Sequence, residues 1–102
     1  MPVRIGQEAG QDACLSLGQV TLRRGGFLAV RSGPGVGYRL RDKLGPGQRL
    51  WLCDHRPGWH GVVYAVQRFD CGVGTPVASV QPYRGPCRQG WVSAAYVEAI
   101  AG

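Results

Sequence analysis

The chain has 102 residues, of which 44% are hydrophobic, and this length accommodates one domain with one modest core. No stretch approaches the ~20 apolar residues that a membrane-spanning helix needs, so we expect no membrane span. Twelve Lys and Arg against six Asp and Glu give a formal net charge of +6, which favours polyanionic partners, but these residues are spread along the chain and form no single basic run.

The N-terminal residues 1–12 are polar and contain Gly, and we expect them to form a flexible arm. A single domain over residues 13–102 follows this arm. The first five residues lack the apolar stretch of an export signal. If the protein works outside the cytoplasm, we therefore expect such a signal to have been removed.

The first half of the domain alternates apolar residues with polar or small ones, a period of two that predicts strands. Strands are expected over residues 14–22 and 27–30, with a Gly-containing turn between them. Residues 32–37 contain three Gly and one Pro, which predicts an irregular loop because Gly adopts backbone angles closed to other residues. Leu40 and Leu44 can pack the segment after this loop against the core.

The second half continues with short strands and turns and contains no convincing long helix. Residues 49–53 form a strand in which Leu50 and Leu52 face one way and Trp51 the other. Residues 54–58 turn the chain. Beyond this turn we expect a long strand at 59–66, a short strand at 77–80, a return strand at 90–92, a 3₁₀ turn at Ala94–Tyr96 and a closing strand at 97–100.

The four cysteines, Cys14, Cys53, Cys71 and Cys87, include no Cys-x-x-Cys pair of the kind that zinc sites use. Two disulfides are favoured, with free buried cysteines as the alternative, and they require an oxidising compartment. Of the three possible pairings we prefer Cys71–Cys87 with Cys14–Cys53. The loop-entropy model gives roughly 3 kcal/mol for the first bond and about 4 kcal/mol for the second.

Several short motifs follow one another in a recognisable order. They are FLAVRSGPG at residues 27–35, LGPGQ at 44–48, GW at 58–59 and GWVSAAYV at 90–97. In this order they resemble the bacterial SH3-like (SH3b) domain, whose pattern runs from an apolar strand ending in VRSGPG to a GWV and a terminal Tyr-Val or Tyr-Leu. The resemblance covers roughly residues 26–100. It implies an all-β, SH3-like barrel of about five to seven short strands, and a binding module rather than an enzyme.

Residues 67–89 depart from this pattern, because the family usually has a short hairpin there. A loop of this length without structure of its own is unusual in a compact domain, and a Cys71–Cys87 disulfide would tether it. Such an insertion is also a natural place for specificity. The side chains available to alter or cover a ligand groove are those of Phe69, Tyr83, Arg84 and Arg88.

By resemblance, the ligand groove is lined by three aromatic residues, Tyr38, Trp59 and Tyr96. Ring faces bind extended or Pro-rich peptides at little cost in ordering. The alternative is that Trp59 or Tyr96 belongs to the core, since a small barrel needs large side chains. Trp51 and Trp91 are expected to be mainly structural.

Three arginines, Arg31, Arg39 and Arg41, can flank this groove and attract carboxylates on a ligand. Solvated surface charge is an equally good interpretation of them. The loop at 32–37 lacks the Gly-Lys-Ser/Thr ending of a phosphate-binding loop, and no helix follows it. We expect no cofactor.

Residues that could carry catalysis are scarce, with six acidic residues and only two histidines, His55 and His60. A Cys53 nucleophile with either His as base is disfavoured, because the strand is expected to end before Pro57. Metal binding by Cys and His is disfavoured as well. We expect neither an enzyme nor a metal site.

The resemblance implies an extracytoplasmic module, periplasmic or secreted, that binds a cell-wall (peptidoglycan) peptide. The alternative is a protein-interaction or structural module whose groove is blocked by the insertion. One version of this alternative is homo-oligomeric. Binding of nucleic acid or another polyanion comes third, because small β-barrels can stack bases beside basic side chains. An oxidising, exported location argues against nucleic acid.

Overall fold

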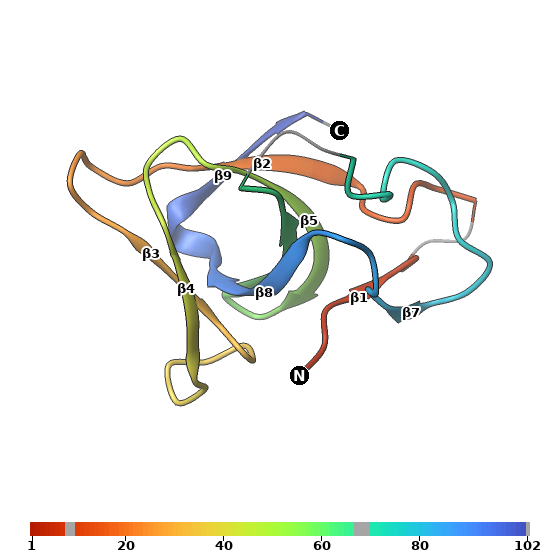
Figure 1. Ribbon diagram of the computed structural model, residues 1–102, viewed down its shortest axis with the longest axis horizontal. Coiled ribbons are helices and arrows are strands. Elements are labelled where there is room, and N and C mark those ends of the chain that lie inside the picture. The colour runs from red at the N-terminus through yellow and green to blue at the C-terminus, as the bar shows by residue number, and fades with distance from the viewer. Residues whose placement is uncertain (8–9, 67–69, 102) are drawn as a thin grey trace.

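The computed structural model describes residues 1–7, 10–66 and 70–101. Within these ranges the fold is all-β, with one 3₁₀ turn, η1, at Ala94–Tyr96 (Figure 1). The strands are β1 (Arg4–Ile5), β2 (Ser16–Val20), β3 (Leu28–Arg31), β4 (Leu40–Leu44), β5 (Arg49–Arg56), β6 (Trp59–Tyr64), β7 (Gln81–Pro82), β8 (Arg88–Ser93) and β9 (Val97–Ala101). The predicted all-β class and the position of the 3₁₀ turn are confirmed.

Seven strands form one antiparallel sheet in the order β4-β3-β8-β6-β5-β2-β9, and β1 pairs with β7 in a second, two-stranded sheet. The large sheet curls strongly. Tyr64 Oη on β6 donates a hydrogen bond to Asp42 Oδ2 on β4 at 2.8 Å, although β8 and β3 lie between these two strands in the sheet order. Leu44 of β4 also shares a buried cluster with Val20 of β2. The sheet therefore wraps around an apolar interior while β4 and β9 remain its two edges.

The predicted alternation of side chains sorts the apolar residues into two buried clusters. The inner core, inside the curl of the sheet, consists of Val20, Leu28, Val30, Leu44, Leu50, Val62, Tyr64 and Val92. The flanking core consists of Val3, Ile5, Ala13, Cys14, Cys53, Val63, Cys71, Val73, Tyr83, Cys87 and Trp91. Leu52 packs on the inner core and Trp51 on the flanking core, so the opposite facing predicted for this strand is confirmed.

The N-terminal segment differs from the flexible arm predicted for residues 1–12. β1 pairs with β7, and Val3 and Ile5 are buried in the flanking core. Tyr83 N–H donates to Val3 O at 2.8 Å. The partners of this segment include Asp54, Tyr83 and Gln89, which lie far along the chain. Its short apolar alternation therefore acquires a buried face only in the folded chain. Residues 8–9 lie outside the described part.

Both disulfides pair as preferred, Cys14 with Cys53 and Cys71 with Cys87. Within the loop that the second bond closes, Tyr83 Oη donates to Cys71 O at 2.7 Å and accepts from Cys87 N–H at 3.2 Å. The two bonds indicate an oxidising environment. In the ranges that the structure describes, no helix is long and apolar enough to cross a bilayer.

Several predicted strand boundaries are wrong, and one predicted strand is absent. β5 continues to Arg56 where a turn was predicted from residue 54, and β6 ends at Tyr64 where a strand to 66 was predicted. The short strand predicted at 77–80 is absent, and Gln81–Pro82 pairs with β1 instead. These differences arise because the long-range partners of these segments decide where each strand ends.

A hydrogen-bonded group ties three strands together at one end of the sheet. Asp42 accepts from Tyr64 Oη, from Arg88 Nη1 at 3.0 Å and from Lys43 N–H at 2.8 Å. Burial alone would raise the pKa of Asp42, but these hydrogen bonds outweigh it and lower the pKa below its ordinary value. A carboxyl whose pKa falls on folding stabilises the fold above its unfolded pKa of ~4, and this contribution is lost as the pH falls through the folded pKa.

The variant Tyr64→Phe removes one donor from Asp42 and should lower the free energy of unfolding by about 1 kcal/mol at neutral pH. This penalty should shrink below pH ~4, where protonated Asp42 gains less from a donor. Guanidinium denaturation at neutral and acidic pH measures both effects. In a chain that carries Asp42→Asn, the stability loss caused by Tyr64→Phe should no longer depend on pH. If Tyr64→Phe costs the same stability at both pH values in the native chain, Tyr64 does not stabilise the ionised form of Asp42.

Candidate functional site

An open groove of about 310 Å³ lies where β3, the start of β6 and η1 meet. Its lining residues are Leu22, Phe27, Leu28, Ala29, Arg31, Val36, Trp59, Ser93 and Tyr96. The period-two alternation of β3 builds one wall. Leu28 and Val30 are buried in the inner core, so Phe27, Ala29 and Arg31 are directed to the opposite side.

The other wall is held by backbone contacts between the β5–β6 turn, η1 and the end of β2. Trp59 lies directly opposite Ser93 in the pairing of β6 with β8. Ala94 N–H donates to the carbonyl of Gly58 at 2.9 Å, and Thr21 N–H donates to the carbonyl of Tyr96 at 2.9 Å. These bonds fix the backbone of Tyr96 while its side chain remains 48% exposed.

The groove combines apolar faces with a positive edge. Arg31 Nη1 donates to the carbonyl of Tyr38 at 3.1 Å, which positions the guanidinium and leaves most of its five donors for other partners. Lys43 Nζ lies 4.7 Å from the ring centroid of Phe27. None of the lining residues is acidic. Chemically, the groove fits an extended chain that offers apolar groups and a negative charge.

Of the predicted ligand residues, the structure brings Trp59, Tyr96 and Arg31 together in this groove. Tyr38 lies close by but is not among the lining residues. Its ring packs against the loop backbone instead: a Cβ built on Gly33 would overlap this ring, and one built on Gly35 would lie 3.4 Å from it. Glycines at these two positions therefore accommodate the ring.

The two remaining predicted arginines lie elsewhere. Arg39 is exposed outside the groove, and its carbonyl accepts from Ser32 N–H at 2.9 Å. Arg41 lines a separate polar pocket beside Asp42 and Tyr64. Neither arginine is among the residues that line the groove.

Sequence reasoning missed two exposed groove residues, Phe27 and Val36, which are 55% and 80% exposed. For Phe27, the alternation of apolar residues over 27–30 indicates an outward-facing side chain. If Leu28 and Val30 face the core, Phe27 must face away with Ala29. The position of Val36 depends on the path of the Gly-rich loop, for which the sequence holds no comparable signal.

The described residues of the insertion do not line the groove. Tyr83 is buried in the flanking core, and Arg88 pairs with Asp42 at 3.0 Å. Arg84 is exposed, and Phe69 lies outside the described residues. In Figure 1 the teal loop before β7 and β7 itself lie at the right of the molecule, away from β3 and β4 at the left. The groove is accordingly open on the part of its border that the structure describes.

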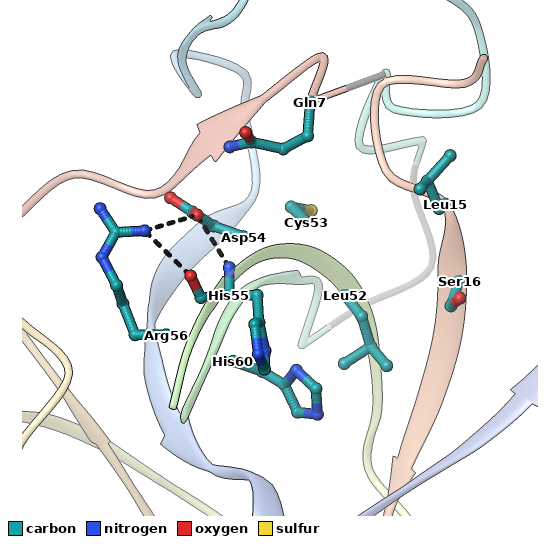
Figure 2. A pocket seen from close by; sticks show the side chains of 9 residues that line it. All are labelled: Gln7, Leu15, Ser16, Leu52, Cys53, Asp54, His55, Arg56 and His60. Atoms are coloured by element: carbon teal, nitrogen blue, oxygen red, sulfur yellow. Dashed lines mark hydrogen bonds and ion pairs between the residues drawn. The ribbon is translucent and has the colours of Figure 1, made fainter. Parts of the chain in front are cut away.

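A second, more polar pocket of about 360 Å³ lies on the β5–β6 hairpin and contains both histidines (Figure 2). Cys53 lines this pocket but is bonded to Cys14, so a Cys53 thiolate is not available there as a nucleophile. Within the ranges that the structure describes, no group of three or more His, Cys, Asp or Glu residues could hold a metal ion.

No protein-family model, curated protein or solved structure matches the chain. The groove must therefore be interpreted from its own shape and chemistry. It is lined by three aromatic side chains, one arginine, one serine and four aliphatic residues, brought together from separate segments of the chain.

Proposed function

We propose that the protein is a non-catalytic, SH3-like binding module that works outside the cytoplasm, in the periplasm or as a secreted protein. Its ligand is an extended cell-wall peptide, which lies in the groove of Phe27, Trp59 and Tyr96. One observation carries the proposal: these aromatic side chains come from three separate segments of the chain and meet in an open groove. Among the described residues, Arg31 is the one charged residue that lines it.

The chemistry of the groove supports a peptide ligand. Aromatic faces contribute large apolar contact areas with few rotatable bonds, which keeps the entropic cost of binding low. Arg31 can form charge-assisted hydrogen bonds with a carboxylate of the peptide. Peptides of the cell wall offer both an extended backbone and free carboxylates.

The fold supports the SH3-like part of the proposal. A strongly curled antiparallel sheet has a single 3₁₀ turn directly before its last strand, and the motifs at residues 27–35 and 90–97 form β3, β8 and η1 around the groove. The two disulfides support export. The open groove argues against the alternative in which the insertion blocks it.

The double variant Phe27→Ala/Tyr96→Ala should weaken binding to purified peptidoglycan about tenfold or more, because it removes two anchoring rings. Both side chains are about half exposed, so the fold should be preserved. Depletion of the protein from solution by increasing amounts of sacculi measures the affinity, and thermal unfolding verifies the fold.

The matched control is Val66→Ala/Ile100→Ala, which removes two exposed apolar side chains outside the groove and should bind like the native protein. Arg31→Gln should weaken binding several-fold, whereas the same change at Arg41, outside the groove, should not. No retention of the native protein on sacculi, or equal losses in both double variants, would refute the proposal.

A further inference from the structure

The two histidines of the chain, His55 and His60, lie opposite each other near the end of the β5–β6 hairpin. Directly paired residues of antiparallel strands place their side chains on the same face of the sheet. The ring centroids are 5.8 Å apart and the ring planes are inclined by 47°. Figure 2 shows the two imidazoles next to each other in the pocket.

A short turn and an irregular register produce this arrangement. Pro57 and Gly58 connect the strands, and Gly58 has φ of +78°, which is the conformation that a type II turn requires after Pro. The register shifts between Leu52 and Asp54. Beyond this shift, His55 pairs directly with His60. The backbone pairing of the hairpin therefore fixes the two histidines opposite each other.

The charged groups around the histidines are already paired. Asp54 accepts from His55 N–H at 2.8 Å, from Arg4 N–H at 3.1 Å and from Arg56 Nη1 at 3.4 Å. The carboxylate thus compensates the charge of Arg56 inside the pocket. The other polar lining residues, Gln7 and Ser16, are uncharged.

The imidazole nitrogens are available for a ligand. Among the residues that the structure describes, the side chains of His55 and His60 take part in no hydrogen bond; the bonds of His55 to Asp54 and Arg56 use its backbone. An imidazole binds a metal ion through the lone pair of a ring nitrogen.

We propose that His55 and His60 together bind one divalent transition-metal ion, with Cu²⁺ bound more tightly than Ni²⁺ or Zn²⁺. Imidazole suits all three ions, and Cu²⁺ forms the strongest complexes in this series. With metal–nitrogen bonds of ~2.1 Å, the ring centres of two imidazoles on one ion lie about 4.5 Å apart when the two bonds form a right angle and about 6.5 Å apart when they point in opposite directions. The observed 5.8 Å lies between these limits.

The two protein ligands leave positions for water or for a ligand brought by another molecule. A structural zinc site has four protein ligands, whereas no third His, Cys, Asp or Glu joins this pair among the described residues. The site is therefore an exchangeable one. It lies apart from the aromatic groove, with which it shares no lining residue.

The test uses the full chain without a histidine tag, freed of metal by a chelator and titrated with CuCl₂, NiCl₂ and ZnCl₂ by calorimetry near pH 7.5. We expect one Cu²⁺ per chain, and an electron paramagnetic resonance spectrum that shows two imidazole nitrogens on the ion. His55→Gln and His60→Gln should each weaken Cu²⁺ binding about tenfold or more. Glu98→Gln, which removes an exposed carboxylate on β9, should not change it.

The charged groups lining the pocket, Asp54 and Arg56, are paired with each other. A single-His variant that binds Cu²⁺ as tightly as the native chain would overturn the proposal. So would a spectrum with one nitrogen, or light scattering that shows one ion shared by two chains.

Discussion

Replacing Cys14 and Cys53 by Ala should lower the free energy of unfolding by about 4 kcal/mol, because the loop of some forty residues that this bond closes regains its freedom in the unfolded chain. A domain of this size has a total stability of roughly 5–15 kcal/mol. The double variant should therefore be marginally folded. Guanidinium denaturation without reducing agent measures the change.

The structure adds a second reason for a large effect. Both cysteines are nearly inaccessible, with Cys14 2% and Cys53 7% exposed, and both pack in the flanking core. This bond connects the chain before β2 to β5, whereas the Cys71–Cys87 bond closes a loop within the insertion. Loss of Cys14–Cys53 should accordingly loosen the whole flanking core.

The matched control is Cys71→Ala/Cys87→Ala, for which the shorter loop predicts about 3 kcal/mol. Its effect should be concentrated in the insertion and β1, and amide exchange should increase there more than in β5 and β6. If neither variant changes the unfolding midpoint, the bonds do not form in the protein, and the inference of an oxidising compartment loses its basis.

Local alternation in the sequence predicts much of the sheet but not its boundaries. Residues 49–53 illustrate both results. A period of two predicts that Leu50 and Trp51 point to opposite faces of the strand, and in the structure they pack on different cores. The end of the strand does not follow, because Asp54 is held inside the fold by the N–H of Arg4, fifty positions away. Such a long-range contact cannot be predicted from the residues next to Asp54.

The same distinction applies to the candidate site. Trp59 and Tyr96 belong to short motifs and lie in regular elements, and the structure places both in the groove. Tyr38 lies in a Gly-rich loop, where the direction of a side chain depends on the path of the backbone, and its ring packs on Gly33 instead. The sequence therefore predicts site residues on strands and turns better than those in irregular loops.

The histidine pair could not be predicted because the end of β5 was predicted too early in the chain. When the turn is assumed to begin at residue 54, His55 lies in the turn and His60 on a strand, and nothing relates them. Once β5 extends to Arg56, the two become direct partners across the hairpin. The pairing register thus brings together two histidines that the sequence alone does not relate to each other.

Trp91→Ala should lower the free energy of unfolding by about 3–5 kcal/mol, the usual range for deleting a fully buried ring. Trp91 is 0% exposed and lies on β8, near the middle of the large sheet. Its side chain covers the backbone of β6, because a Cβ built on Gly61 would lie 3.3 Å from Trp91 Cη2. Trp51→Ala is the control, since this half-buried ring only borders the same cluster, and it should cost less than half as much.

Trp91→Phe isolates the polar part of this side chain. Trp91 Nε1 donates to the carbonyl of Met1 at 2.8 Å, and Phe keeps a large ring while removing this donor, so we expect a loss of about 1–2 kcal/mol. The amides of Val3 and Arg4 are bonded to the side chains of Gln89 and Asp54. If Trp91 anchors the N-terminal segment, hydrogen exchange at these two amides should accelerate more in Trp91→Phe than exchange at Val62 in the inner core. Equal acceleration at all three amides would mean that Trp91 supports the fold only as a whole and does not hold this segment in place.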